Sequence, residues 1–344
     1  MSEGRSTLLE RLRRLTETYG PSGREDAVRA LIEEEIRPFA DEVRVDALGN
    51  LIARRAPRGA AGAAGASRRV LVAAHMDEIG LIATHIDDNG FIRFDPVGGQ
   101  DAKVLVGQRV RFENGVIGII GHEKLEDAKD LKLAKLFIDI GARSGAEARE
   151  RVRVGDMAVF HRPLERAGDR LIAKAMDDRS GCAVVIEAMS RLESSPHEIF
   201  FVFTVQEEVG LRGARTAAYG VEPDVAVAVD ITLAGDTPEP AHRVDVKLGK
   251  GPAIKIKDLS VISHPLVRDW MTRAAEGHGI PYQYEVLPIG GNDAGAMQVA
   301  RAGVPSGTLS IPCRYAHTPV EMVDAGDLEN AVRLLVAMLE GPIG

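Results

Sequence analysis

The chain has 344 residues, which is enough for a large core and for more than one domain. The chain has 43 basic and 51 acidic side chains, so its net charge is −8. It has no cluster of basic residues, which argues against nucleic-acid binding. The N-terminal segment lacks the apolar stretch of a signal peptide and no segment is long enough for a membrane span, so we expect a cytoplasmic protein without membrane partners. Cys182 and Cys313 form no CxxC pair, and we expect both to be small buried side chains.

Two helices and a strand pair are predicted in the first part of the chain. The stretch Thr7–Glu10 has the spacing of a capping box and precedes leucines at helical intervals, so the first helix should begin there. Ser22–Glu25 repeats the box before a second amphipathic helix. Residues 43–52 are typical of a strand, a turn and a strand. The Ala/Gly-rich segment 56–69 is interpreted as a surface loop and is assigned no function.

The pattern of the chain changes twice further along. Between about residues 78 and 168, short alternating apolar and polar runs are broken by Asp-Asn-Gly and Gly-Gly turns, which predicts antiparallel strands of a barrel or sandwich. After Ala173, longer strands alternate with helices, which indicates βαβ units. We therefore expect an α/β fold. Its mixed, mostly parallel sheet, flanked by helices, would comprise residues 1–76 plus 169–344, and residues 77–168 would form an inserted small β-barrel.

Five predicted strands end in side chains that could bind a metal ion. Ligands of open α/β sheets bind beyond the carboxyl ends of the strands. These ends carry His75 and Asp77, Asp177 and Asp178, Glu207 and Glu208, Asp230, and, after the last strand, His317. Taken singly, each has a simpler explanation, such as a helix cap for Asp178 or a turn for Asp230. Together, two histidines and several carboxylates without a cysteine favour a hydrolytic Zn, Co or Mn site over a structural zinc site.

Six stretches of the chain also match a known family in order and spacing. They are AAHMDEIG, KAMDDRSGC, VQEEVGLRGA, AVDIT, GGNDAGAMQVARAGVPSG and IPCRYAHTPVEMVD. The chain resembles the tetrahedral (TET) aminopeptidases, a metallopeptidase family with glutamyl and deblocking aminopeptidases and some members labelled endoglucanase. The resemblance covers nearly the whole chain. It departs from the family at Asn292, where threonine is commoner, and in the Ala/Gly-rich loop.

The resemblance implies a zinc-peptidase-like catalytic domain with two divalent metal ions per subunit. Zn²⁺ is the preferred ion, with Co²⁺ or Mn²⁺ as alternatives. The implied ligands are His75 and Asp230 for one ion, Glu208 and His317 for the other, and Asp177 as the bridge between them. Glu207 would be the general base, and Asp77 would hydrogen-bond the far nitrogen of His75.

The resemblance has two further implications for the structure. The peptide bond between Asp177 and Asp178 would be cis. The β insertion would mediate dimer contacts, and six dimers would form a hollow tetrahedral dodecamer.

Amide hydrolysis explains why these residue types occur together. A two-metal site lowers the pKa of a bridging water and polarises the substrate carbonyl. A carboxylate beside the metals can take the proton of that water and deliver it to the leaving nitrogen. Successive side chains of extended backbone point in different directions, so Glu208 can coordinate while Glu207 faces the water. The predicted function is a metallo-aminopeptidase that removes N-terminal residues from peptides, and the preferred P1 side chain stays open.

Two alternative functions are kept beside this prediction. A dinuclear N-acyl amino-acid deacylase or carboxypeptidase would share the ligand layout, but its substrate carboxylate calls for an arginine from a separate lid domain. In this chain the inserted segment is the predicted β-barrel, which comes immediately after the first predicted ligand, His75. A catalytically inactive metal-binding scaffold would lack the base or the bridge, and the sequence contains candidates for both.

Overall fold

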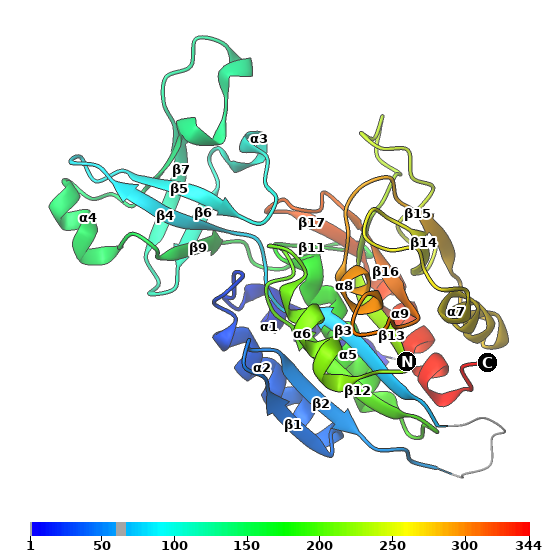
Figure 1. Ribbon diagram of the computed structural model, residues 1–344. Coiled ribbons are helices and arrows are strands. Elements are labelled where there is room, and N and C mark those ends of the chain that lie inside the picture. The colour runs from blue at the N-terminus through cyan, green and yellow to red at the C-terminus, as the bar shows by residue number, and fades with distance from the viewer. Residues whose placement is uncertain (1, 60–66) are drawn as a thin grey trace.

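The computed structural model describes residues 2–59 and 67–344. Figure 1 shows a larger α/β unit, from which a smaller unit of β-strands projects on one side. Within the described ranges, every helix is too short or too polar to cross a lipid bilayer.

The larger unit is built on one mixed sheet, which has 11 strands within the described part of the chain. The strands are β1 (Glu42–Val45), β2 (Leu51–Arg55), β3 (Arg69–His75), β10 (Glu165–Ala167), β11 (Arg170–Ala173), β12 (Glu198–Thr204), β13 (Val225–Leu233), β14 (Ala253–Lys257), β15 (Gln283–Val286), β16 (Ser306–Arg314) and β17 (Glu321–Asp324). Their order is β1-β2-β12-β3-β13-β16-β17-β11-β10, with β14 beside β16 and β15 beside β14. The central strands β12, β3, β13 and β16 are parallel, and the strands toward both edges of this order are antiparallel. The predicted mixed sheet is confirmed, with its parallel pairing concentrated at the centre.

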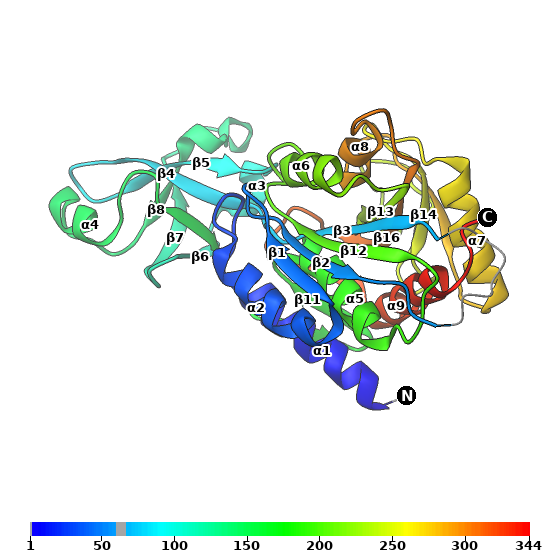
Figure 2. The ribbon, with the colours of Figure 1, turned by 60° about the horizontal axis from the view of Figure 1, so that its bottom comes forward.

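Helices cover both faces of this sheet. In Figure 2, α6 and α8 lie above the central strands, whereas α1, α2, α5 and α9 lie below them. The helices of the larger unit are α1 (Ser2–Glu17), α2 (Asp26–Ile36), α5 (Met176–Arg191), α6 (Arg212–Val221), α7 (Pro265–Gly277), α8 (Asp293–Gln298) and α9 (Ala325–Glu340), with a 3₁₀ turn at Arg37–Phe39. The central strands are buried on both faces, and for that reason their sequences are almost continuously apolar.

The smaller unit is a closed antiparallel barrel with the strand order β4-β5-β8-β7-β6-β9. Its strands are β4 (Gly80–Ile86), β5 (Ile92–Val97), β6 (Arg109–Phe112), β7 (Ile117–His122), β8 (Leu136–Asp139) and β9 (Met157–Phe160), and its helices are α3 (Ala102–Leu105) and α4 (Gly145–Arg151), with 3₁₀ turns at Ala128–Asp130 and Leu133–Lys135. Alternate apolar residues of these strands form a separate hydrophobic core. The short alternating runs of the sequence are thus strands of a barrel and not of a sandwich.

The structure corrects two of the predicted helix starts. The first helix begins at Ser2 and not at Thr7, so the predicted capping box lies inside the helix. The second helix begins at Asp26, and its N-cap, Glu25, makes no side-chain capping bond to the helix. The hydroxyl of Ser22 is unavailable for the predicted cap because it donates to Asp77 Oδ2 at 2.6 Å.

Three other predictions can be compared with the described chain. The strand expected to end at Asp230 continues to Leu233, because its last residues pair with β16. Cys182 and Cys313 are both buried and free, as predicted. Of the Ala/Gly-rich segment, residues 60–66 lie outside the described residues.

Candidate metal centre

A cavity of about 400 Å³ lies at the carboxyl ends of the central strands. His75 is the last residue of β3, Glu207 and Glu208 follow β12, Asp230 lies near the end of β13, and His317 follows β16. The cavity is lined by six of the residues singled out in the sequence: His75, Asp177, Glu207, Glu208, Asp230 and His317. The parallel centre of the sheet therefore brings together side chains that are far apart in the sequence.

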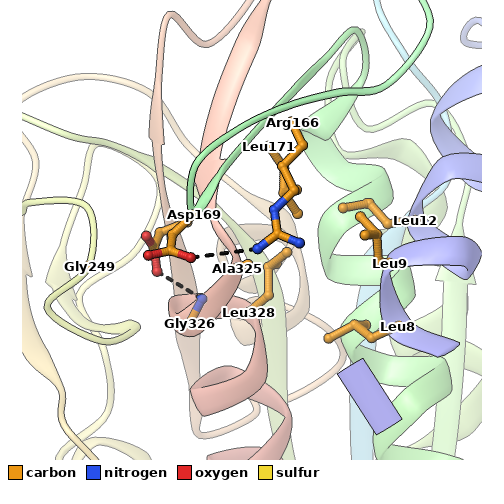
Figure 3. Close-up of a pocket in the computed structure, with 11 residues that line it drawn as sticks. Leu8, Leu9, Leu12, Arg166, Asp169, Leu171, Gly249, Ala325, Gly326 and Leu328 are labelled. Atoms are coloured by element: carbon orange, nitrogen blue, oxygen red, sulfur yellow. Dashed lines mark hydrogen bonds and ion pairs between the residues drawn. The ribbon is translucent and has the colours of Figure 1, made fainter. Parts of the chain in front are cut away.

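A second cavity of about 410 Å³ has a different character. Figure 3 shows it between leucines of α1, the β10–β11 hairpin and the start of α9. Arg166 and Asp169, which form an ion pair at 3.6 Å, lie at its edge. Among the described residues that line it there is neither histidine nor cysteine. We therefore place the metal chemistry in the first cavity.

Asp177 lies between the two histidines of the site. Its Oδ1 is 2.9 Å from Nε2 of His75, and its Oδ2 is 3.3 Å from Nε2 of His317. Burial alone would raise the pKa of Asp177, but the hydrogen bonds with His317 and His75 hold this pKa below its usual range. The peptide bond from Asp177 to Asp178 is cis, as the resemblance implied. One carboxylate thus presents one oxygen to each histidine.

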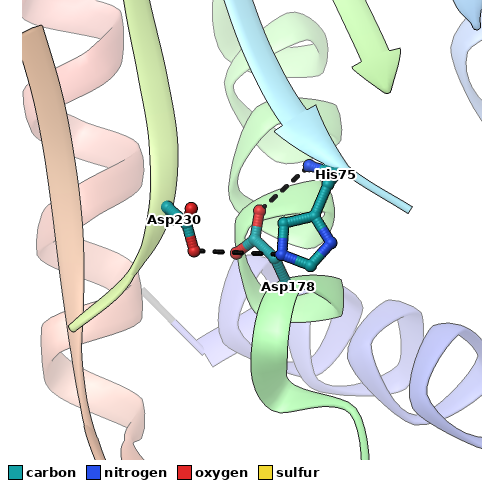
Figure 4. Close-up of side chains that lie close together, drawn as sticks. All are labelled: His75, Asp178 and Asp230. Carbon is teal, nitrogen blue, oxygen red and sulfur yellow. Dashed lines mark hydrogen bonds and ion pairs between the residues drawn. The ribbon is translucent and has the colours of Figure 1, made fainter. Parts of the chain in front are cut away.

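Two further carboxylates flank this central group. Oδ1 of Asp230 is 4.0 Å from Nε2 of His75, and Oε2 of Glu208 is 3.4 Å from Nε2 of His317. Two sets of three side chains place their ligand atoms within 4.8 Å of one another: His75, Asp178 and Asp230, drawn in Figure 4, and His75, Asp177 and Glu208. Both sets contain His75, so they belong to one compact cluster of candidate ligands.

The donor set fits divalent metal ions. Burial raises the pKa of Glu208 to about 7 despite the attraction of His317, and its Oε1 has no hydrogen-bond partner in the described chain. Burial also raises the pKa values of Glu207 and Asp230 well above their usual range. Carboxylates this crowded and buried need more positive charge than two histidines supply. Imidazole nitrogens and carboxylate oxygens are ligands of Zn²⁺, and carboxylates also suit Mn²⁺.

The adjacent residues Glu207 and Glu208 approach different histidines. Oε2 of Glu207 lies 4.0 Å from Nε2 of His75, whereas Oε2 of Glu208 lies 3.4 Å from Nε2 of His317. Both side chains line the cavity. The chain therefore directs two neighbouring carboxylates toward different histidines of the same centre, from a turn after β12 and not from the extended backbone that was predicted.

Asp77 does not line the cavity, but it contacts three residues that do. Its Oδ1 is 3.5 Å from Nδ1 of His75, and its backbone carbonyl oxygen is closer to that nitrogen, at 3.1 Å. The same carboxylate accepts the backbone N–H groups of Glu207 at 3.0 Å and Glu208 at 3.2 Å, and the hydroxyl of Ser22 at 2.6 Å. Asp77 thus joins the histidine to the turn that carries both glutamates.

Two more acidic residues hold backbone N–H groups at the site. The carboxylate of Glu321 accepts the backbone N–H of Asp177 at 3.0 Å and that of His317 at 2.8 Å. Asp178 accepts the backbone N–H of His75 at 3.2 Å and that of Gly181 at 3.0 Å, so it both caps α5 and ties α5 to β3. The sequence offered a signal for the cap at Asp178, whereas the contacts of Glu321 follow only from the fold.

A buried ion cluster lies next to Asp77. Nζ of Lys174 is 2.8 Å and 2.6 Å from the two carboxylate oxygens of Glu78, and the guanidinium of Arg179 is 3.5 Å from the same carboxylate. These side chains are at most 2% exposed. The cluster connects the residue after Asp77 to the segment that carries Asp177.

The barrel also contacts the centre. The backbone carbonyl of Gly99, in the segment after β5, lies 2.9 Å from Nδ1 of His317. Gly98 has a φ of +82°, and a Cβ added there would lie 2.7 Å from Ile79 and 3.2 Å from Oε2 of Glu208. A loop of the insertion therefore packs against two of the candidate ligands.

The fold thus brings candidate metal-binding residues together in one cavity. The chain belongs to the M42 glutamyl aminopeptidase family, whose sequence profile matches residues 49–334. It is 51% identical over 330 residues to a protein of Acetivibrio thermocellus with a provisional aminopeptidase name, covering 96% of this chain and 97% of the relative. It is 36% identical over 345 residues to the lysyl aminopeptidase of Pyrococcus furiosus, with 96% of each chain covered.

Solved structures agree with this assignment. An aminopeptidase of the archaeon Desulfurococcus kamchatkensis has a TM-score of 0.93 and 42% identity, covering 98% of this chain and 96% of its own. A Pyrococcus horikoshii TET peptidase that can assemble into a tetrahedron or a large octahedral shell has a TM-score of 0.84 and 38% identity, covering 96% and 99%. A Thermotoga maritima protein named endoglucanase has a TM-score of 0.80 and 33% identity, covering 96% of each chain. The resemblance to the TET aminopeptidases is confirmed.

Proposed function

We propose that the protein is a dinuclear metallo-aminopeptidase that removes N-terminal residues from peptides. The observation that carries the proposal is the position of Asp177, with one carboxylate oxygen at hydrogen-bonding distance from His75 and the other near His317. A bridge between two ions needs such an arrangement. His75 and Asp230 would hold one ion, and Glu208 and His317 the other. Zn²⁺ is the ion we propose, with Co²⁺ or Mn²⁺ as alternatives.

When bound, the metal pair would supply Lewis acidity, which would polarise the scissile carbonyl and lower the pKa of a water. The rest of the reaction is assigned to residues of this chain. Glu207 lines the cavity and would take the proton of the attacking water, then deliver it to the leaving nitrogen. Asp77 would hold the ring of His75 and, through its bonds to two backbone N–H groups, the position of Glu207. Glu321 would fix the backbone on which Asp177 is carried.

Exopeptidase selectivity would follow if the free α-amine of the substrate binds beside a metal ion and the acidic side chains that line the cavity. The family description names glutamyl residues and a relative is a lysyl aminopeptidase. The two names specify different residues, so neither determines which P1 side chain this chain prefers.

The proposed domain division places the catalytic unit in residues 1–76 plus 169–344 and the barrel in residues 77–168. The position of the closed barrel between β3 and β10 supports this division. We further propose that the barrel mediates dimer contacts and that six dimers form a dodecamer, as a TET relative that assembles into a tetrahedron suggests. The two free, buried cysteines fit a reducing compartment, and we propose the cytoplasm.

The function is tested by a panel of aminoacyl-p-nitroanilides, with N-acetyl amino acids as the alternative substrates. The purified protein is assayed after chelation and again after addition of Zn²⁺, Co²⁺ or Mn²⁺. We expect release of p-nitroaniline only when metal is present, and no hydrolysis of the N-acetyl amino acids. Preferential hydrolysis of the N-acetyl compounds would favour a deacylase. Inactivity of a metal-loaded protein on both classes would favour a metal-binding scaffold.

A further inference from the structure

The cavity of the metal centre continues into an apolar part. Leu233, Leu287 and Ile289 line this part, and all three belong to one hydrophobic cluster. Leu233 and Ile289 are only half-buried, so they keep apolar surface that an incoming group would cover. Apolar walls beside a few polar groups are typical of a site that binds part of a small ligand.

The one cation of the remaining cavity wall is already paired with two buried carboxylates. Among the described residues that line the cavity, Lys255 is the one charged side chain outside the metal centre. It lies opposite Glu285 on the neighbouring strand, and its Nζ donates to Oε1 of that residue. The same Nζ is 3.2 Å from Oδ2 of Asp258, and the three side chains are at most 3% exposed. Neither acid lines the cavity.

This arrangement disfavours both charged types of ligand group. A carboxylate that entered the apolar part would meet an ammonium already paired with two acids. An ammonium that entered would meet the ammonium of Lys255, because Lys255 lines the cavity whereas Asp258 and Glu285 lie behind it. A charged group that loses its water without gaining a partner binds poorly.

We propose that this part of the cavity binds the P1 side chain and selects uncharged, apolar residues such as leucine and methionine over glutamate and lysine. The proposal rests on the aminopeptidase function proposed above, because that reaction places the P1 side chain next to the metal centre. Loss of hydration without a new partner is expected to lower kcat/KM for a glutamate or lysine substrate about 10²-fold relative to leucine.

The first test compares leucyl, methionyl, glutamyl and lysyl p-nitroanilides on the metal-loaded wild-type protein. We expect kcat/KM for the first two to exceed kcat/KM for the last two by about 10²-fold. Equal or better hydrolysis of the glutamyl or lysyl substrate would overturn the proposal and leave the aminopeptidase function intact. Failure to cleave all four substrates would overturn both.

The second test removes the negative charge of Glu285, which pairs with Lys255. Glu285→Gln keeps the size of the side chain and removes one of the two negative charges that pair with Lys255. We expect the ratio of glutamyl to leucyl kcat/KM to rise by about tenfold, since an opposite charge nearby favours a charged group. Glu150→Gln makes the same change in net charge on α4 of the barrel, and should leave the ratio unchanged. An unchanged ratio in a folded, metal-loaded Glu285→Gln variant would contradict the role of this ion group.

A further variant covers the case in which Glu285→Gln does not fold. Ile289→Lys adds an ammonium at a half-buried loop position of the apolar wall and leaves the buried ions as they are. It should also raise the glutamyl-to-leucyl ratio, by at least tenfold, by lowering leucyl and raising glutamyl hydrolysis. An unchanged ratio would place the P1 side chain elsewhere and overturn the proposal.

Discussion

Amide substitutions should separate the roles of the adjacent residues Glu207 and Glu208. Both changes are nearly isosteric, and both sites are buried, with side-chain exposures of 10% and 3%. Glu207→Gln removes a proton acceptor 4.0 Å from the ring of His75. We expect both metal ions to remain, KM to change little and kcat to fall about 10²–10⁴-fold. At about 1.36 kcal/mol per tenfold, this loss corresponds to roughly 3–5 kcal/mol of transition-state stabilisation.

Glu208→Gln should fail in a different way. Its carboxylate has an unpartnered Oε1 and an Oε2 that is 3.4 Å from His317, so the change removes a negative charge from the proposed second metal position. One ion should be lost or weakened, and excess metal should restore part of the activity.

The assay combines elemental analysis of metal per subunit, after removal of free ions, with kcat and KM on a leucyl substrate. The wild-type protein and the barrel variant Glu150→Gln serve as controls and should both hold two ions. Loss of an ion from Glu207→Gln, or two tightly held ions in Glu208→Gln, would refute the assignment of base and ligand.

Two other predictions concern stability and assembly. Lys174→Met should lower the free energy of unfolding by about 3–5 kcal/mol, because it leaves the buried carboxylate of Glu78 with only the more distant Arg179. Urea unfolding of the metal-free protein measures this loss; adding Glu78→Gln should recover part of it, and a loss below about 1 kcal/mol would contradict the reasoning. Light scattering at micromolar concentration should show a large homo-oligomer, and a stable monomer with full activity would refute the proposed dodecamer.

The elements that position the site could be predicted because their signals are local. The apolar runs that became β3, β12 and β13 are long, and a potential ligand lies at or near the end of each: His75 ends β3, Glu207 and Glu208 come shortly after β12, and Asp230 lies in the second half of β13. The rule that ligands lie at the carboxyl ends of parallel strands then placed His75, Glu208 and Asp230 near one another without knowledge of strand order.

Contacts between distant segments could not be predicted in the same way. Ser22 precedes Asp77 by 55 positions, and its sequence context gave a plausible local partner, so the capping interpretation was wrong. Glu321 binds the backbone of a residue 144 positions earlier, and backbone N–H groups carry no sequence signature. Strand propensity also could not decide between a barrel and a sandwich, because closure depends on pairing between β4 and β9, which are far apart in the chain.

The contact of Gly99 with His317 makes the insertion part of the chemistry and not a detachable accessory. The carbonyl at position 99 is an acceptor for the ring nitrogen opposite the one that faces Asp177, so it selects the tautomer in which Nε2 is free to bind a metal. Excision of the barrel would leave that ring without its orienting partner. A tilt of the barrel relative to the sheet would move the carbonyl that orients the ring of His317.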